Sequence, residues 1–235
     1  MTDAVLDDPA ALAAHAAGWL ADTLQAMPGR AAVSLSGGST PKAMYELLAK
    51  PSLAARMPWD RVHWFWGDER FVPHGDAKSN FRMVREAMLA HVPVPPDNIH
   101  PVPTEGMSAE DAAGLYEAEL QRFYGARVLQ PGRPLFDVVL LGLGANGHTA
   151  SLFPDTPVLE ERTAWAAAVE PAGEPTRITL TYPVLESCAH AAFLVAGADK
   201  RDVLARVRGG DASLPAAVYH PAGELHWFTD RAAAG

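Results

Sequence analysis

One histidine lies in a glycine-rich segment that directly follows the most apolar run of the sequence. His148 belongs to GLGANGHTASLFP, residues 142–154, and the apolar run FDVVLL occupies residues 136–141. Glycines beside a histidine let the backbone, and with it the imidazole, come close to a bound molecule. Because imidazole titrates near neutral pH, His148 is suited to act as a general base that activates water. A lone histidine is more often structural than catalytic, but the flanking glycines favour a functional role, and the chemistry that this segment could support is hydrolysis by direct attack of water.

The sequence argues against three other kinds of site: a dinucleotide site, a serine nucleophile and a zinc site. The first six residues of the segment match the dinucleotide pattern G-x-G-x-x-G, but Pro154 shortens the helix that a pyrophosphate needs, and no strand ending in an acid follows about 20 residues later. The nucleophile pattern G-x-S-x-G is absent. The zinc pattern H-E-x-x-H is also absent, and the nine histidines are scattered. We therefore expect chemistry that uses no serine nucleophile, metal or organic cofactor.

A second glycine-rich loop, SGGSTP at residues 36–41, joins a short apolar strand to a helix. Gly37 and Gly38 let the backbone approach a ligand, and Ser39 and Thr40 add hydroxyl groups. The free N–H groups and the dipole at a helix start favour an anion, typically phosphate. The Walker A pattern does not fit this loop, and an ordinary strand-to-helix turn is the alternative reading. We predict a phosphate site at these four residues.

A third string, Asp68-Glu69-Arg70, follows an aromatic strand. Burying such charges is costly unless they are paired or used, and ligands bind at the carboxyl ends of parallel strands. Arg70 could hold a phosphate with its planar guanidinium. A solvated turn with a local ion pair is the alternative. Arg177 and Lys200, near the starts of a later strand and a later helix, are read as surface charges when taken alone.

The elements that position these loops alternate between strand and helix over the first 150 residues. This alternation predicts an α/β fold, with a mostly parallel sheet and helices on both faces. The predicted strands are 31–36, 61–66, 136–141, 164–169, 176–182, 190–196 and 225–229. The predicted helices are 9–27, one from Pro41, 79–91, 108–124 and 199–208. The loops after residues 36, 66 and 141 should meet at one edge of the sheet, because ligands bind where parallel strands end.

Composition narrows the class of protein. The chain has 235 residues, of which 49% are hydrophobic, enough for a sizeable core in one large domain or two small ones. The formal net charge of -9 disfavours nucleic acid and anionic lipid as partners. A single cysteine suits a reducing compartment, and the start MTDAVLDDPA lacks the layout of a secretory signal. No apolar run is long enough to cross a bilayer, so we expect a cytoplasmic protein.

Five strings together resemble the 6-phosphogluconolactonase family, within the glucosamine-6-phosphate isomerase/6-phosphogluconolactonase superfamily. They occur in the family's order from about residue 30 to the end of the chain, which makes the resemblance specific although each string alone is not. The strings are SLSGGSTP (34–41), WFWGDERFVP (64–73) with SNF (79–81), GLGANGHTASLFP (142–154), RITLTYPVL (177–185) and GADKRDVL (197–204).

The resemblance implies a fold, an activity and a set of partners. The fold would be one α/β domain over residues 1–235, a three-layer sandwich with a modified Rossmann-like sheet (NagB/RpiA/CoA-transferase-like). The activity would be hydrolysis of 6-phospho-D-glucono-1,5-lactone to 6-phospho-D-gluconate, the second step of the oxidative pentose phosphate pathway, without metal or cofactor. The partner would be the phosphosugar lactone, bound by a monomer or weak dimer.

The resemblance also implies roles for individual residues. The loop Gly37–Thr40 matches the phosphate-binding turn, and His148 matches the base that deprotonates water. The basic positions expected to hold phosphate or polarise the lactone carbonyl are matched by Arg70, Arg177 and Lys200. The family usually reads G-x-D-G-H, whereas this chain has Asn146. Asn146 can orient the imidazole but cannot stabilise an imidazolium by charge, so Asp68 or Glu69 would supply that charge, or the enzyme would be slower than its relatives.

Two other functions compete with the lactonase. A glucosamine-6-phosphate deaminase shares the G-x-x-G-H loop, but that family tends to continue toward F-N-E-P and to carry L-D-E-Y at the second loop. This chain has SLFP and GDER there. A sugar-phosphate sensor of this fold would need a DNA-binding module, and the residues before the first predicted strand hold a single predicted helix.

Overall fold

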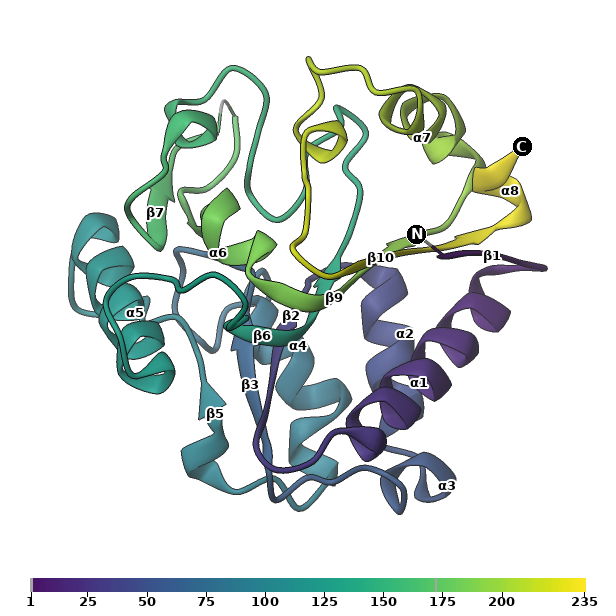
Figure 1. Cartoon of the computed structure of the whole chain (residues 1–235), viewed down its shortest axis with the longest axis horizontal. Helices are drawn as coiled ribbons and strands as arrows, with labels where there is room; N and C mark the ends of the chain where they lie inside the picture. The colour runs from purple at the N-terminus through teal and green to yellow at the C-terminus, as the bar shows by residue number, and fades with distance from the viewer. Residues whose placement is uncertain (1, 172) are drawn as a thin grey trace.

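A seven-stranded sheet lies at the centre of the computed structural model, which describes residues 2–171 and 173–235 (Figure 1). Its strand order is β1-β10-β9-β6-β2-β3-β5, and each neighbouring pair is parallel. The strands are β1 (Thr2–Leu6), β2 (Ala31–Leu35), β3 (Val62–Trp66), β5 (Ile99–His100), β6 (Phe136–Leu141), β9 (Cys188–Val195) and β10 (Glu224–Asp230). The predicted central strand 136–141 is confirmed, with β9 on one side and β2 on the other.

A second, antiparallel sheet of three strands stands beside the first. It consists of β4 (Asp68–Arg70), β7 (Ala166–Val169) and β8 (Arg177–Leu180), in the order β4-β8-β7. The charged string at 68–70 was expected to be a loop, and this expectation is wrong, because its backbone pairs with β8. Gly67 alone separates β4 from β3, so the chain passes from one sheet to the other within a single residue.

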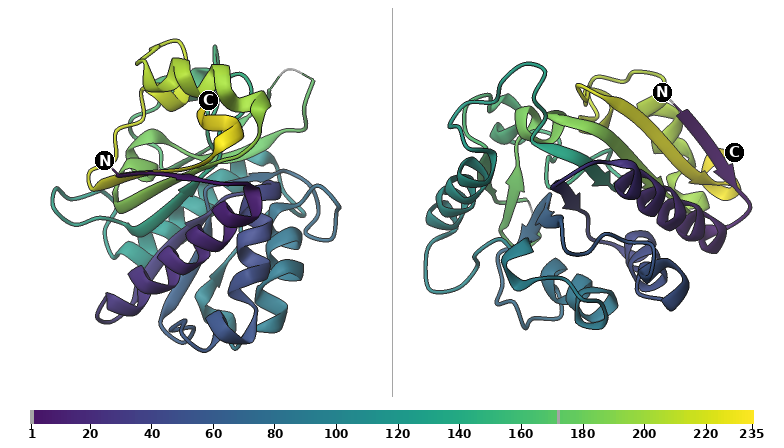
Figure 2. Two further views of the ribbon diagram at one scale, coloured as in Figure 1. Left: turned by 90° about the vertical axis from the view of Figure 1, so that its right-hand side faces the viewer. Right: turned by 60° about the horizontal axis from the view of Figure 1, so that its bottom comes forward.

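Helices cover both faces of the main sheet, which confirms the predicted three-layer α/β sandwich (Figures 1 and 2). The helices α1, α2 and α4 lie on one face, and α7 and α8 lie on the other, while α5 packs against β7 and β8. The helices are α1 (Pro9–Ala26), α2 (Ser39–Leu48), α3 (Pro51–Ala54), α4 (Asn80–Ala87), α5 (Ala109–Tyr124), α6 (Tyr182–Glu186), α7 (Arg201–Arg208) and α8 (Arg231–Ala234). Short 3-10 turns occur at Leu89–His91, Pro96–Asn98, Pro157–Glu160, Ala198–Lys200 and Pro215–Ala217.

Local capping explains where three of the helices begin. Asp8, Ser79 and Ser108 each accept a hydrogen bond from the backbone N–H three residues later, as expected of N-cap residues. Helix α2 begins at Ser39, two residues before the predicted start at Pro41. The edge strands β1 and β5 were not predicted.

The sheet is buried on both faces. All five residues of β2 are buried, and Trp64, Phe65, Trp66 and Phe136 are fully covered. Continuous apolar strands of this kind are typical of a parallel sheet between two helical layers. Among residues 2–171 and 173–235, no helix combines the length and the apolar character that a membrane crossing requires.

Candidate active site

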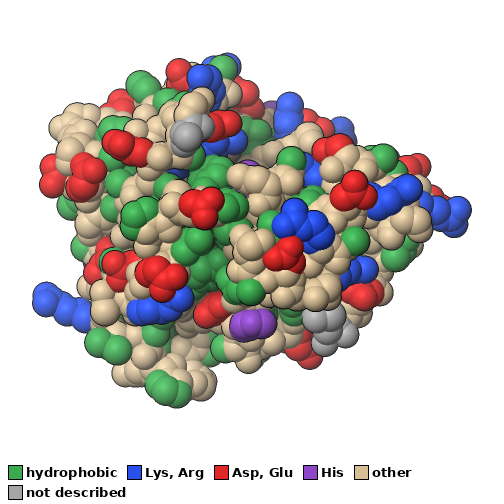
Figure 3. Space-filling view, turned by 90° about the horizontal axis from the view of Figure 1, so that it is seen from above, with side chains coloured by type: hydrophobic (Ala, Val, Ile, Leu, Met, Phe, Trp, Pro, Cys, Tyr) green, Lys and Arg blue, Asp and Glu red, His purple; other side chains and the backbone are tan. Residues whose placement is uncertain are grey.

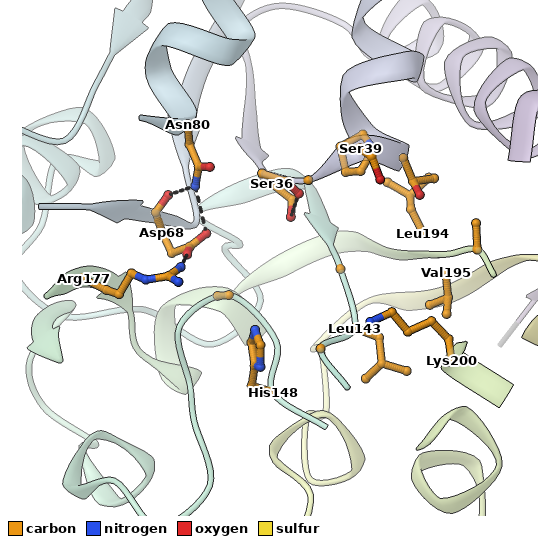
Figure 4. Close-up of a pocket in the computed structure, with 18 of the residues that line it drawn as sticks. Ser36, Ser39, Asp68, Asn80, Leu143, His148, Arg177, Leu194, Val195 and Lys200 are labelled. Carbon is orange, nitrogen blue, oxygen red and sulfur yellow. Dashed lines mark hydrogen bonds and ion pairs between the residues drawn. The ribbon is translucent and has the colours of Figure 1, made fainter. Parts of the chain in front are cut away.

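A pocket of about 280 Å³ opens at the carboxyl ends of the parallel strands (Figure 4). It is lined by the loops after β2 and β6, by the second sheet and by the turn before α7. The segments after residues 36, 66 and 141 therefore meet as predicted, although the second of them is the strand β4 and not a loop. The predicted residues that line it are Gly37, Gly38, Ser39, Thr40, Asp68, Arg70, His148, Arg177 and Lys200. Of the predicted site residues, Glu69 and Asn146 do not line it.

The loop before α2 presents a helix N-terminus to the pocket. Gly38 adopts φ 108°, which favours glycine, and within the described residues no side chain caps the helix that follows. A Cβ on Gly37 would lie 2.2 Å from Oδ1 of Asn80, so any larger residue there would displace the Asn80 side chain. The uncapped N–H groups and the helix dipole together favour an anion at this point.

Three cationic side chains contribute positive charge to the pocket. Arg177 lies 3.6 Å from the Asp68 carboxylate, Arg70 donates from Nη1 to the carbonyl of Lys78 at 2.7 Å, and Lys200 lies 3.4 Å from Asp199. Among the described residues, the buried Nε atoms of both arginines have no hydrogen-bond partner. Figure 3 shows Lys and Arg interspersed with Asp and Glu over the face seen from above. A chain of net charge -9 thus carries a locally basic pocket.

Asp68 belongs to a buried hydrogen-bonded network on one flank of the pocket. Its Oδ2 accepts from the hydroxyl of Ser151 at 2.7 Å, and its backbone carbonyl accepts from Nδ2 of Asn80 at 3.0 Å. Figure 4 shows Asp68 between Asn80 and Arg177, with His148 nearby. The negative charge of Asp68 acts to raise the pKa of His148, as that of Glu174 does to a smaller extent, so Asp68 can stabilise an imidazolium there.

Glu69, by contrast, faces away from the pocket and anchors the start of α4. Its Oε1 accepts from the backbone N–H groups of Arg70 and Asn80, and its Oε2 accepts from the N–H of Phe81 and the hydroxyl of Ser79. Glu69 as a whole is 1% exposed. Burial raises the pKa of its carboxyl group, while the hydrogen bonds from the backbone lower it. The geometry therefore gives Glu69 a structural position rather than a place near the reacting groups.

Replacing Glu69 by glutamine is expected to destabilise the fold. The amide nitrogen would face two of the four donors that the carboxylate now satisfies, at a cost of about 2 kcal/mol in the free energy of unfolding. For a chain of this size, that lowers Tm by about 4–8 °C in a thermal melt. Glu86→Gln, on the exposed face of α4, is the matched control and should leave Tm nearly unchanged. Equal melting of the two variants would contradict the structural role.

His148 is held in place by the loop after β6. Its Nδ1 lies 2.5 Å from Oδ1 of Asn146, which also accepts from the His148 backbone N–H at 3.3 Å. The imidazole packs on the ring of Phe153, with 4.3 Å between centroids. An amide oxygen only accepts, so Nδ1 carries the proton and Nε2 is left free to take one. Asn146 thus lies outside the pocket and sets the tautomer of the histidine inside it.

The electrostatic surroundings keep His148 neutral. Burial lowers the pKa of His148 from its ordinary value of 6.5, the charges of Arg177 and Lys200 lower it further, and Asp68 opposes the shift. A neutral imidazole with a free Nε2 is the form that can accept a proton from water at pH 7. The arrangement can therefore perform general-base chemistry beside an anion site.

Exchanging Asn146 for aspartate is expected to raise the pKa of His148, because a carboxylate beside Nδ1 favours the imidazolium. In wild type, the midpoint of the fall of kcat/KM with decreasing pH should lie below pH 6.5, since the folded pKa of His148 is lowered from that value. In Asn146→Asp, the fall of kcat/KM on the acidic side of the pH profile should occur at higher pH. Activity at pH 8 should equal or exceed that of wild type. A pH profile, corrected for spontaneous hydrolysis, measures both.

A large loss of activity at pH 8 in Asn146→Asp would show that a different group orients the ring. Asn146→Leu serves as the control, because it removes the acceptor without adding charge. It should lower kcat and leave the acidic limb where it is in wild type.

Some residues of the pocket were not predicted as functional. Asn80 is not among the predicted site residues, yet it lines the pocket and donates to the backbone carbonyl of Asp68. Ser151 is fully buried and donates to Asp68 across 83 positions of the sequence. Both residues belong to strings that carry the family resemblance, SNF and TASLFP, which is the one signal that could have singled them out.

Comparison with known proteins agrees with the geometry. The family model described as glucosamine-6-phosphate isomerases/6-phosphogluconolactonase matches residues 7–227. The chain belongs to this family. A 6-phosphogluconolactonase of Nostoc sp. is 44% identical over 216 residues, which cover 90% of this chain and 87% of the relative. One of Synechocystis sp. is 43% identical over 208 residues, which cover 87% and 84%.

Solved structures show the same architecture. A 6-phosphogluconolactonase from Trypanosoma cruzi superposes with a TM-score of 0.87 at 28% identity, covering 99% of this chain and 95% of that one. A 6-phosphogluconolactonase from Thermotoga maritima gives a TM-score of 0.83 at 28% identity, covering 98% and 99%. A monomeric glucosamine-6-phosphate deaminase shares the fold, with a TM-score of 0.82 at 20% identity over 100% and 99% of the chains.

Proposed function

We propose that the protein hydrolyses 6-phospho-D-glucono-1,5-lactone to 6-phospho-D-gluconate, the second step of the oxidative pentose phosphate pathway. The observation that carries the proposal is one pocket in which a neutral histidine with a free Nε2 faces a helix N-terminus and three cations. Hydrolysis of a phosphorylated ester requires both a base that activates water and a positive site that binds the phosphate. Family membership and the similarity to proteins named 6-phosphogluconolactonase support it.

The proposed mechanism follows from the charges around the pocket. The phosphate binds at the start of α2, at Gly37–Thr40, with Arg70. Nε2 of His148 takes a proton from water as the water oxygen attacks C1 of the lactone. Arg177 and Lys200, whose charges both act on His148, stabilise the oxyanion that forms.

Collapse of the tetrahedral intermediate completes the reaction. The bond from C1 to the ring oxygen breaks, and the leaving alkoxide takes the proton that His148 holds. Asp68 stabilises the imidazolium while it exists, and Asn146 keeps the ring oriented. The base is thereby regenerated.

The partners and the domain organisation belong to the same proposal. The lactone is the small-molecule partner, without nucleic acid, and the protein works in the cytoplasm as a monomer or weak dimer. Residues 1–235 act as a single domain, which is supported by a pocket built from both sheets: Asp68 and Arg177 come from the second sheet, and Gly142 follows a strand of the main one.

A direct comparison of substrates separates this function from deamination. The protein is incubated with freshly generated 6-phosphogluconolactone and, separately, with glucosamine 6-phosphate, and the products are identified by NMR. We expect rapid formation of 6-phosphogluconate and no ammonia from the amino sugar. Ammonia release together with an uncatalysed lactone rate would establish the deaminase instead.

A further inference from the structure

Two histidines and a glutamate meet at the end of the main sheet that lies opposite the pocket. His190 stands near the start of β9, and Glu224 and His226 stand at the start of β10. The parallel register places Glu224 beside His190, and residues two apart on a strand share a face, so the three side chains lie together. At about 3.3 Å per residue, His190 is about 16 Å along β9 from Val195, which lines the pocket. The cluster is therefore separate from the active site.

The atoms that could bind a metal form a nearly equilateral triangle. Nδ1 of His190 lies 3.3 Å from Nε2 of His226 and 3.6 Å from Oε2 of Glu224, and the last two atoms are 3.5 Å apart. In a tetrahedral zinc site with bonds of 2.0–2.2 Å, neighbouring ligand atoms lie about 3.4 Å apart. The triangle thus already has the size of one face of a zinc coordination tetrahedron.

The surroundings suit a site of this kind. His226 is buried, with 7% of its side chain exposed, and the ring of Trp19 on α1 lies 5.0 Å from it. The Glu224 side chain is 68% exposed, so the fourth side of the tetrahedron is open to water.

We propose that His190, Glu224 and His226 bind one divalent transition-metal ion of the zinc class, with water as the fourth ligand. Two imidazoles and a single carboxylate suit Zn²⁺, whereas Mg²⁺ and Ca²⁺ prefer sets of oxygen ligands. The ion would cross-link β9 to β10 at the amino end of the sheet. Its contribution is to the stability of the fold, since lactone hydrolysis takes place at the other end.

Titration of the metal-stripped protein tests the proposal. We expect isothermal titration with ZnCl₂ to show one site per chain, and Co²⁺ to give the intense visible absorption of tetrahedral coordination. His190→Ala and Glu224→Gln should each weaken Zn²⁺ binding by at least about tenfold, since loss of even an outer-shell partner costs that much. At one fixed Zn²⁺ concentration, the ion should raise the Tm of wild type more than that of Glu224→Gln.

Two controls locate the ion. His220→Ala removes an exposed histidine outside the cluster, and His148→Ala removes the histidine of the pocket; both should bind Zn²⁺ as wild type does. His190 and Glu224 are partly exposed, so their variants remain usable if replacement of the buried His226 prevents folding. The absence of a Zn²⁺ site, unchanged binding in both cluster variants, or loss of binding in His148→Ala would overturn the proposal. None of these readouts depends on the lactonase activity.

Discussion

Replacement of His148 by alanine should lower kcat/KM for lactone hydrolysis by at least about a hundredfold, the usual contribution of a general base. The neutral imidazole, with Nδ1 bonded to Asn146, is the group in the pocket suited to take the proton of the attacking water. The loss should appear in kcat, because phosphate binding depends on the start of α2 and the cations. Initial rates of acid release, with the spontaneous rate subtracted, measure the effect.

The His148→Ala protein must also be shown to be folded and able to bind its ligand. Its Tm and its inhibition by inorganic phosphate should match wild type, since neither depends on the imidazole. Wild-type kcat in the folded variant would rule out His148 as the base. Loss of phosphate inhibition together with activity would mean that the residue organises the pocket.

Gly144→Ala should reduce kcat about a hundredfold, although it adds only a methyl group. A Cβ at residue 144 would lie 2.1 Å from both Cε1 and Nδ1 of His148, so the imidazole must leave its position. Displacement of a reacting group by about 1 Å is enough for a loss of this size. The pocket cations are untouched, so inhibition by phosphate should persist.

Gly142→Ala is the matched control for this variant, because it adds the same methyl group to the same loop. Its Cβ would have Ser36 Oγ as nearest neighbour, at an ordinary 3.7 Å. We expect this variant to retain most of its activity. Equal rates for the two variants would show that the position of the His148 ring does not limit catalysis.

The parts of the fold that could be predicted are those with a local cause. Helix starts at Asp8, Ser79 and Ser108 follow from a side chain that caps the next turn. The buried strand 136–141 follows from its apolar run. The short strand β4 could not be found in this way, because its charged residues disfavour a strand and its pairing partner β8 lies over a hundred residues away.

The same limit applies to the side chains of the site. The sequence places three loops at one edge of the sheet, and the structure confirms that edge. The sequence does not show whether Asp68 or Glu69 faces the pocket. Neighbouring side chains of a strand point to opposite faces, so the answer depends on β4 being a strand. The histidines are scattered along the sequence, but the register of β9 and β10 brings His226 to His190.

The most direct test of the proposed function is the rate of acid release from freshly generated 6-phospho-D-glucono-1,5-lactone at constant pH, with and without the protein. We expect a rate that rises in proportion to protein concentration, saturates with the lactone and falls when inorganic phosphate competes for the start of α2. Unphosphorylated glucono-1,5-lactone should be hydrolysed much more slowly, because it lacks the group that the basic pocket binds. A rate equal to that of buffer alone, at any protein concentration, would contradict the proposed function.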